Sequence, residues 1–129
     1  MINGDESPRY PPVRHDHRQI DDRKRASLLD VMETNYMYNL SLEEYARISN
    51  RSLATFKRQF KSLFYTTPGK WLMARRLDYA LLMLRTTRKN INEITLECGF
   101  ENSSHFSRVF KERFGTSPLN YRKSRRAAI

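Results

Sequence analysis

Short side chains and basic side chains recur at one spacing in two segments of the chain that lie 50 residues apart. The first set is Ala54, Lys57, Arg58 and Lys61, and the second set is Ser104, Ser107, Arg108 and Lys111. The spacing i, i+3, i+4, i+7 places four residues on one face of an α-helix. Short side chains let a helix approach base edges, an Arg can bind guanine O6 and N7 bidentately, and a Lys can neutralise a phosphate. The pattern therefore predicts two helices that read duplex DNA.

Phenylalanines repeat in the same two segments. Phe56 and Phe60 correspond to Phe106 and Phe110 at the same offset. Exposed rings could stack on the bases of a single strand, but their strict helical period indicates a buried core face instead. Solvation alone would also put Lys and Arg on a helix surface. It does not explain why two such faces match within a longer repeat.

The longer repeat also contains a short helix and a tight turn before each basic face. The predicted capping boxes are Ser41 with Glu44 and Asn90 with Glu93. The offset changes from 49 to 50 along the repeat, so the second copy has one extra residue in its middle. Asn50 and Gly99 stand at the turns, and both residue types tolerate positive φ. Each copy is therefore predicted to be a helix-turn-helix unit.

The whole pattern predicts an all-α fold of seven helices, with two homeodomain-like three-helix units joined by a long connector helix. The expected helices cover about 22–37, 42–49, 52–64, 68–86, 91–98 and 103–114, followed by a short one from Pro118 toward Arg125. The predicted organisation is a flexible arm or linker remnant at 1–20, a first unit at 21–66, the connector at 67–87, a second unit at 88–125 and a basic tail end at 126–129.

The connector segment is apolar around most of its circumference. Its stripe is Ala74, Leu77, Leu81 and Leu84, and Trp71, Leu72, Tyr79 and Met83 widen it on both sides. A helix this broadly apolar is expected to pack against both units and to hold them rigidly. We therefore expect the two basic helices to lie about 34 Å apart, one turn of B-DNA, on one face of a duplex.

The overall composition favours a polyanionic partner. The chain has 129 residues, with 24 Lys and Arg against 14 Asp and Glu, a net charge of +10, and its pI is about 10.1. No apolar run approaches the roughly 20 residues of a membrane span, and no signal peptide opens the sequence. A single cysteine, Cys98, fits a reducing bacterial cytoplasm, with the protein at the nucleoid.

Residues that could support catalysis or metal binding are few, so no enzyme, cofactor or metal is expected. Cys98 falls on a buried helical stripe, where a thiol is inert. His15 and His17 have no Cys or third His nearby, so they would make a poor metal site. His105 could contact a phosphate or could be a partly buried structural histidine.

The second unit and the segment after it carry a family resemblance. Cys98-Gly99-Phe100, Ser104-His105-Phe106-Ser107-Arg108-Val109-Phe110-Lys111, Phe114-Gly115-Thr116-Ser117-Pro118 and Tyr121-Arg122 together resemble the signature of the AraC/XylS family of bacterial transcription regulators. The likeness covers about 22–124. It implies a DNA-binding domain whose helices at about 52–64 and 103–114 enter successive major-groove segments.

The resemblance also implies roles for individual residues and partners. The implied base-reading residues are Ala54, Lys57, Arg58, Ser103, Ser104, Ser107 and Arg108, and the implied phosphate contacts are Lys61 and Lys111. Ala54 is smaller than the side chain that is common there in the family, although it can touch a thymine methyl. The implied partners are a double-stranded DNA operator, RNA polymerase and an N-terminal effector-binding domain. The chain is then either a stand-alone DNA-binding domain or the C-terminal piece of a longer regulator.

A second interpretation is a nucleic-acid-binding protein without sequence preference, held mainly by charge. Its candidates are Arg122, Lys123, Arg125 and Arg126. The ratio of affinities for defined and scrambled duplexes distinguishes the two interpretations. We expect a monomer, because the two units already supply two reading helices and no heptad seam remains unused.

Overall fold

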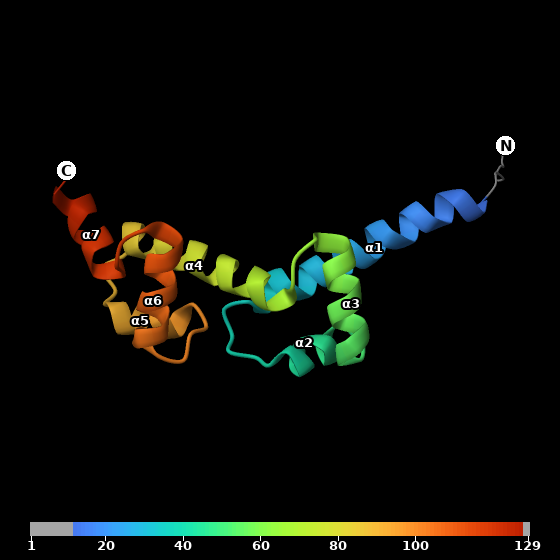
Figure 1. Ribbon diagram of the computed structural model, residues 1–129, viewed down its shortest axis with the longest axis horizontal. Helices are drawn as coiled ribbons and strands as arrows, with labels where there is room; N and C mark the ends of the chain where they lie inside the picture. The colour runs from blue at the N-terminus through green and yellow to red at the C-terminus, as the bar shows by residue number, and fades with distance from the viewer. Residues whose placement is uncertain (1–11, 128–129) are drawn as a thin grey trace.

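The computed structural model describes residues 12–127, and within that range it contains seven helices and no strand. The helices are α1 (Pro12–Asn35), α2 (Leu42–Ile48), α3 (Leu53–Phe64), α4 (Pro68–Thr86), α5 (Ile91–Glu97), α6 (Ser103–Phe114) and α7 (Pro118–Ala127). The molecule is elongated, with α1–α3 at one end, α5–α7 at the other and α4 running between them (Figure 1). The predicted all-α fold of seven helices is confirmed.

Both predicted capping boxes are present. The Ser41 hydroxyl accepts a hydrogen bond from the Glu44 backbone N–H at 3.2 Å, and the Glu44 carboxylate accepts one from the Ser41 N–H at 2.8 Å. Asn90 and Glu93 make the same reciprocal pair at 2.8 and 2.9 Å. Each box satisfies backbone donors that a helix start leaves without partners.

The turns between the paired helices also follow the prediction. Asn50 has φ 61° and Gly99 has φ 95°, so both adopt the left-handed conformation that lets a short turn reverse direction. The caps of the following helices are Ser52, which accepts from the Thr55 N–H, and Asn102, which accepts from the His105 N–H.

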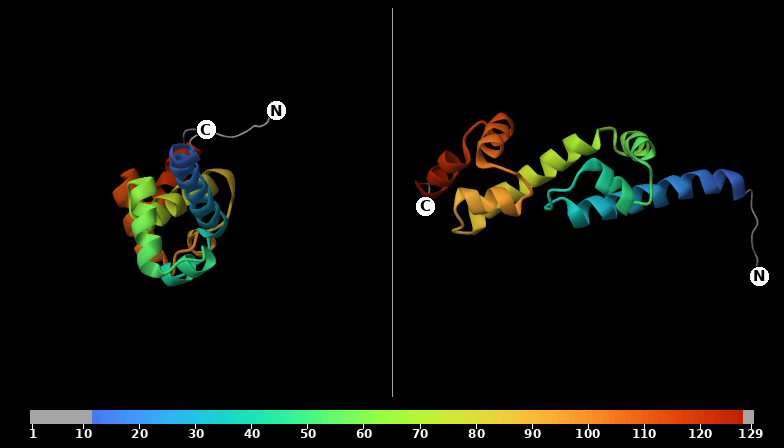
Figure 2. Two further views of the ribbon diagram at one scale, coloured as in Figure 1. Left: turned by 90° about the vertical axis from the view of Figure 1, so that its right-hand side faces the viewer. Right: turned by 90° about the horizontal axis from the view of Figure 1, so that it is seen from below.

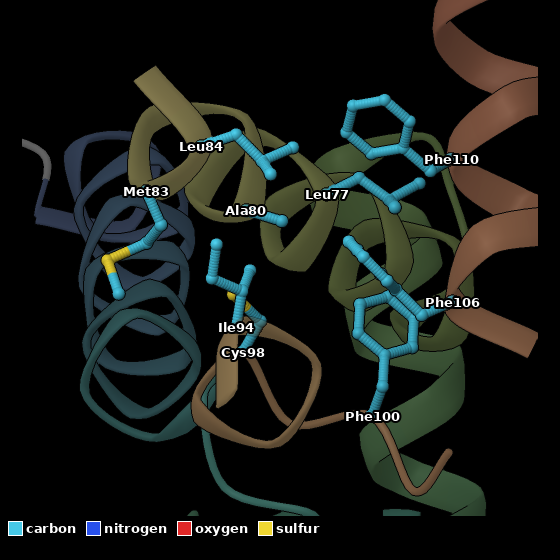
Figure 3. Close-up of a cluster of buried hydrophobic side chains, with 9 residues drawn as sticks. All are labelled: Leu77, Ala80, Met83, Leu84, Ile94, Cys98, Phe100, Phe106 and Phe110. Atoms are coloured by element: carbon cyan, nitrogen blue, oxygen red, sulfur yellow. The ribbon is translucent and has the colours of Figure 1, made fainter. Parts of the chain in front are cut away.

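Two hydrophobic cores hold the helices, and α4 contributes to both. The first core consists of Leu28, Met32, Tyr36, Tyr45, Ala46, Phe56, Phe60 and Leu72. The second consists of Leu77, Ala80, Met83, Leu84, Ile94, Cys98, Phe100, Phe106 and Phe110 (Figure 3). The phenylalanines of the repeat are thus fully buried, and the connector packs against both groups of helices as predicted.

The first helix is longer than the sequence predicted. It begins at Pro12, whereas we expected a start near 22, so residues 12–20 of the expected arm or linker remnant are helical. The rest of that arm, residues 1–11, lies outside the described residues. Proline is compatible with a first helical turn because its missing N–H has no helical partner there. The last helix similarly continues past Arg125 to Ala127, into the expected tail.

Candidate nucleic-acid interface

The predicted face of α3 is open to solvent. Ala54, Lys57, Arg58 and Lys61 are all exposed, while Phe56 and Phe60 fill the core behind them. Within residues 19–125, no ion pair engages these three basic side chains. Their charge is therefore available to an external anion.

Arg58 also borders a shallow groove between α3 and the early part of α1. The groove is lined by Asp21, Lys24, Arg58, Gln59, Ser62 and Leu63. Lys24 adds a positive charge beside the α3 face, and Asp21 adds a negative one. The sequence did not identify either residue, because their proximity to α3 depends on how α1 packs against it.

The predicted face of α6 divides into two parts. Ser104, Arg108 and Lys111 are exposed, whereas Ser103 and Ser107 are partly buried at its edge. Arg108 lies 3.8 Å from the Glu112 carboxylate one turn along the helix. Both side chains are about two-thirds exposed, so the pair is weak and a phosphate or base can compete for the arginine.

Ser103 and Ser107 line an open groove of about 350 Å³ beside α6. The rest of its lining comes from the starts of α5 and α7 and the residue before each, namely Asn90, Ile91, Asn92, Ser117, Pro118 and Leu119. Because the Asn90 side chain is already bonded as a helix cap, Asn92 is the neighbouring amide that remains to face a ligand. Asn92 was not predicted as a site residue from the sequence. Its position two residues after the predicted cap Asn90 places it in the first turn of the helix, where a polar side chain could have been recognised as a candidate.

The exposed faces of α3 and α6 belong to helices that lie along the same edge of the molecule. Viewed from below, α3 and α6 are both seen nearly end-on along the same edge of the elongated body (Figure 2). They therefore run in roughly similar directions on one side of α4. This arrangement suits two helices that enter one duplex from the same side.

Arg122 is not part of a charged tail, contrary to the expectation for the charge-only interpretation. Its side chain is buried, with 7% exposure. The guanidinium donates hydrogen bonds to the carbonyls of Leu84, Thr87 and Lys89. Arg122 therefore holds α7 against the end of α4 and the loop after it. Lys123 and Arg125, by contrast, are exposed.

Other candidates for chemistry are arranged as structural groups. Cys98 is fully buried, and burial raises the pKa of its thiol to about 12, so it is not a thiolate near neutral pH. His105 is partly buried, and its ring meets Phe100 edge-on at 6.0 Å between centroids. The side chains of His15 and His17 lie outside the described residues. In the part that the structure describes, no three His, Cys, Asp or Glu residues gather as for a metal, and no helix could cross a membrane.

The fold and the paired exposed faces define a protein with two helix-turn-helix units. A family model described as a helix-turn-helix domain matches residues 45–124. The chain belongs to the AraC/XylS family of transcription regulators, in which it corresponds to the C-terminal DNA-binding domain.

Relatives with known roles are transcription regulators. The HTH-type transcriptional regulator ExsA of Pseudomonas aeruginosa is 31% identical over 119 residues, which are 92% of this chain and 43% of the relative. The HTH-type transcriptional activator RhaS of Enterobacter sp. (strain 638) is 33% identical over 108 residues, 84% of this chain and 39% of the relative. The chain thus spans roughly two-fifths of the length of these relatives.

Solved structures share the fold. The DNA-binding domain of AdpA, a global transcriptional factor crystallised with a target DNA, superposes with a TM-score of 0.75 at 28% identity, covering 81% of this chain and 95% of that one. A regulator with an AraC-type DNA-binding domain from Chromobacterium violaceum gives a TM-score of 0.70 at 32% identity, covering 81% and 93%.

Proposed function

We propose that the chain is the sequence-specific DNA-binding domain of a bacterial transcription regulator, and that α3 and α6 read two successive major-groove segments of one operator. The observation that carries this proposal is the pair of matched exposed faces on one side of α4. Each face has short side chains near the helix start and basic side chains further along. The helix starts add backbone N–H groups, which favour phosphate.

Within this proposal, individual residues divide into readers and phosphate contacts. The base readers are Ala54, Lys57, Arg58, Ser103, Ser104, Ser107 and Arg108, and the phosphate contacts are Lys61 and Lys111. Exposure supports this division for most of them, since an exposed Arg can adopt the bidentate geometry that guanine requires. Ser103 and Ser107 would act at the flank of α6, together with Asn92.

The intact regulator is proposed to contain more than this domain. Because the chain spans only two-fifths of the relatives' length, an N-terminal effector-binding region and contacts with RNA polymerase fit the remaining functions of such a regulator. Action at the bacterial nucleoid follows from an operator as the target. These partners rest on the family and not on particular side chains described above.

Selection of bound duplexes from a random pool, followed by footprinting, tests the proposal. We expect enrichment of one sequence with two protected groove segments on the same face, bound about a thousandfold or more tightly than a scrambled duplex. A pool that yields no enriched sequence would contradict sequence reading. Protection of one groove segment, or of opposite faces, would contradict the paired arrangement of α3 and α6.

Salt dependence separates this function from charge-only binding. A charge-only binder shows the same affinity and the same steep salt slope for cognate and scrambled duplexes. A groove reader keeps a preference for its site at every salt concentration. The burial of Arg122 already removes one of the four cations on which the charge-only interpretation depends.

A further inference from the structure

Arg76 of α4 ties the connector to the end of α1. Its Nε donates a hydrogen bond to the Tyr36 carbonyl at 2.6 Å, and one Nη donates to the Tyr38 carbonyl at 2.9 Å. The same Nη lies 3.4 Å from the Tyr45 hydroxyl. A cation at this point also interacts favourably with the negative end of the helix dipole. Arg76 therefore fixes the loop that joins α1 to α2 against the connector.

The turn between α5 and α6 packs directly on this arginine. A Cβ placed on Gly99 would lie 2.9 Å from Arg76 Nε, 3.0 Å from the Tyr36 carbonyl oxygen and 3.1 Å from that of Met37. These distances are shorter than side-chain contacts normally allow. Gly99 is thus required at this position for close approach as well as for its positive φ.

A second contact joins the same two segments. The Asn39 amide, in the loop after α1, donates a hydrogen bond to the Glu101 carboxylate at 3.1 Å. Glu101 immediately precedes Asn102, the cap of α6. We call the group formed by Tyr36, Asn39, Arg76, Gly99 and Glu101 the inter-unit seam, because it connects the α1–α2 loop to the start of α6.

We propose that the inter-unit seam sets the relative placement of α3 and α6, and so determines the spacing between half-sites that the protein accepts. The proposal rests on the function proposed above. The connector α4 packs into both cores and is the main link between the two groups of helices. The seam adds a second link, because Asn39 in the α1–α2 loop contacts Glu101, two residues before α6 begins at Ser103. This second link limits rotation of the two groups about the axis of α4. The seam residues are positioning residues and need not touch DNA.

A distance measurement without DNA tests the mechanical part. Spin labels on Ser62→Cys in α3 and Glu112→Cys in α6 report on equivalent exposed positions of the two helices. The native Cys98 is buried and does not compete for the label. We expect one narrow distance distribution in the otherwise unchanged chain. Gly99→Ala should shift or broaden it.

Gly115→Ala is the matched control for Gly99→Ala. Both glycines have positive φ, but nothing lies within 4 Å of a Cβ on Gly115. The two substitutions therefore share the backbone strain and differ in the seam contact. The proposal is overturned if Gly99→Ala leaves the distance distribution unchanged, or if Gly115→Ala alters it equally. Circular dichroism verifies that both variants remain helical.

A second pair of variants tests the arginine. Arg76→Ala should broaden the distribution as Gly99→Ala does. Arg75→Ala, one position earlier, removes a 2.8 Å ion pair with Glu33 and a ring contact with Tyr36. Those contacts join α4 to α1 through Glu33 and the Tyr36 ring, whereas the seam uses the Tyr36 carbonyl. They do not reach α5 or α6, so this control should keep the narrow distribution. Equal broadening by both variants would show that the seam has no special role.

Binding to duplexes with altered spacing tests the consequence for DNA. Duplexes selected by the unchanged protein are rebuilt with one or two base pairs added or removed between the half-sites. A rigid pair should lose about a hundredfold in affinity when both sites cannot be engaged together. In Gly99→Ala and Arg76→Ala this loss should fall below about tenfold, with weaker binding to the best duplex.

The distance measurement and the binding measurement together distinguish failure of this inference from failure of the proposed function. If no duplex is selected, the proposed function fails, and the distance measurement still decides whether the seam holds the units. If a duplex is selected but the seam variants keep the original spacing preference, the inference is wrong and the proposed function stands.

Discussion

The depth of a basic residue along its helix determines what it is expected to contact. Arg58 and Arg108 lie one turn into α3 and α6, whereas Lys61 and Lys111 lie about one turn further on. We expect Arg58→Ala or Arg108→Ala to cost about 1–3 kcal/mol on the selected site and to relax the preference at one base pair, as loss of a bidentate contact would.

Lys61→Ala and Lys111→Ala serve as the comparison. Each should weaken cognate and scrambled duplexes to a similar extent and reduce the salt slope by about one, because a phosphate contact carries no sequence information. Competition binding over a set of single base-pair variants measures both effects. Equal weakening of cognate and scrambled duplexes by Arg108→Ala would remove it from the base readers.

Cys98 should make stability depend on pH in the alkaline range. The thiol has a pKa near 12 in the folded protein, against an ordinary value of 9.0. Because the folded-state pKa is raised, the stabilisation is complete below about pH 9 and is lost as pH rises toward 12. The difference in free energy of unfolding between the native chain and Cys98→Ala should therefore shrink over this range. Lysines and tyrosines that titrate there are common to both proteins, so their effects cancel. A constant difference would contradict the raised pKa.

The structural roles of two arginines, the partly buried Arg76 and the buried Arg122, could not be predicted from the sequence. Arg76 and Arg122 stand among many other basic residues, and no local pattern distinguishes them from solvated ones. Their hydrogen bonds are made to carbonyls of residues at least 33 positions away. Such contacts depend on tertiary placement of the carbonyls, which residue spacing does not encode. Helical spacing alone predicted the exposed basic side chains of α3 and α6, but it did not predict that Ser107 is partly buried.

At the scale of helices, the repeat also relates the residues that end α3 and α6, which were not compared in the sequence analysis. Tyr65 has φ 60° at the end of α3, and Gly115 has φ 81° at the end of α6, 50 residues further on. Glycine is the residue most favoured in the left-handed conformation at the C-terminal end of a helix. Comparison with Gly115 would have predicted the conformation of Tyr65 from the sequence.

Tyr65→Gly should stabilise the protein by roughly 1 kcal/mol, because it relieves the left-handed strain of a residue with a Cβ. The tyrosine is 88% exposed, so little burial is lost. Gly115→Ala should destabilise by a comparable amount. Urea unfolding measures both, and an unchanged or lower stability of Tyr65→Gly would show that its side chain contributes more than its exposure suggests.

Helix boundaries were predictable where a cap or an apolar stripe marks them. The starts of α2 and α5 have capping boxes, and their positions agree with the sequence prediction. The start of α1 has neither signal, since its first ten residues are mostly polar and show no apolar residues at helical spacing. Hydrophobic periodicity identifies a helix by its apolar stripe. It cannot detect a helical extension whose sequence has no such stripe.

For the whole molecule, we expect a monomer in the absence of DNA. The apolar stripe of α1 already packs within the first core, where Leu28 and Met32 are fully buried. The larger hydrophobic side chains that remain exposed, such as Leu82, Leu96 and Leu119, come from different helices. Sedimentation equilibrium at tens of micromolar measures the mass directly. A stable dimer would mean that one of these exposed groups forms an interface.

The role of Arg122 has a consequence for the order in which the protein forms during synthesis. All residues of the first core precede Met73, so that half can be complete while later codons are still being translated. The second half needs α7, because Arg122 supplies hydrogen bonds to carbonyls at the end of α4 and beyond it. We therefore expect α3 to be folded on the ribosome before α6. A nascent chain stalled ahead of Arg122 would present only α3 to DNA.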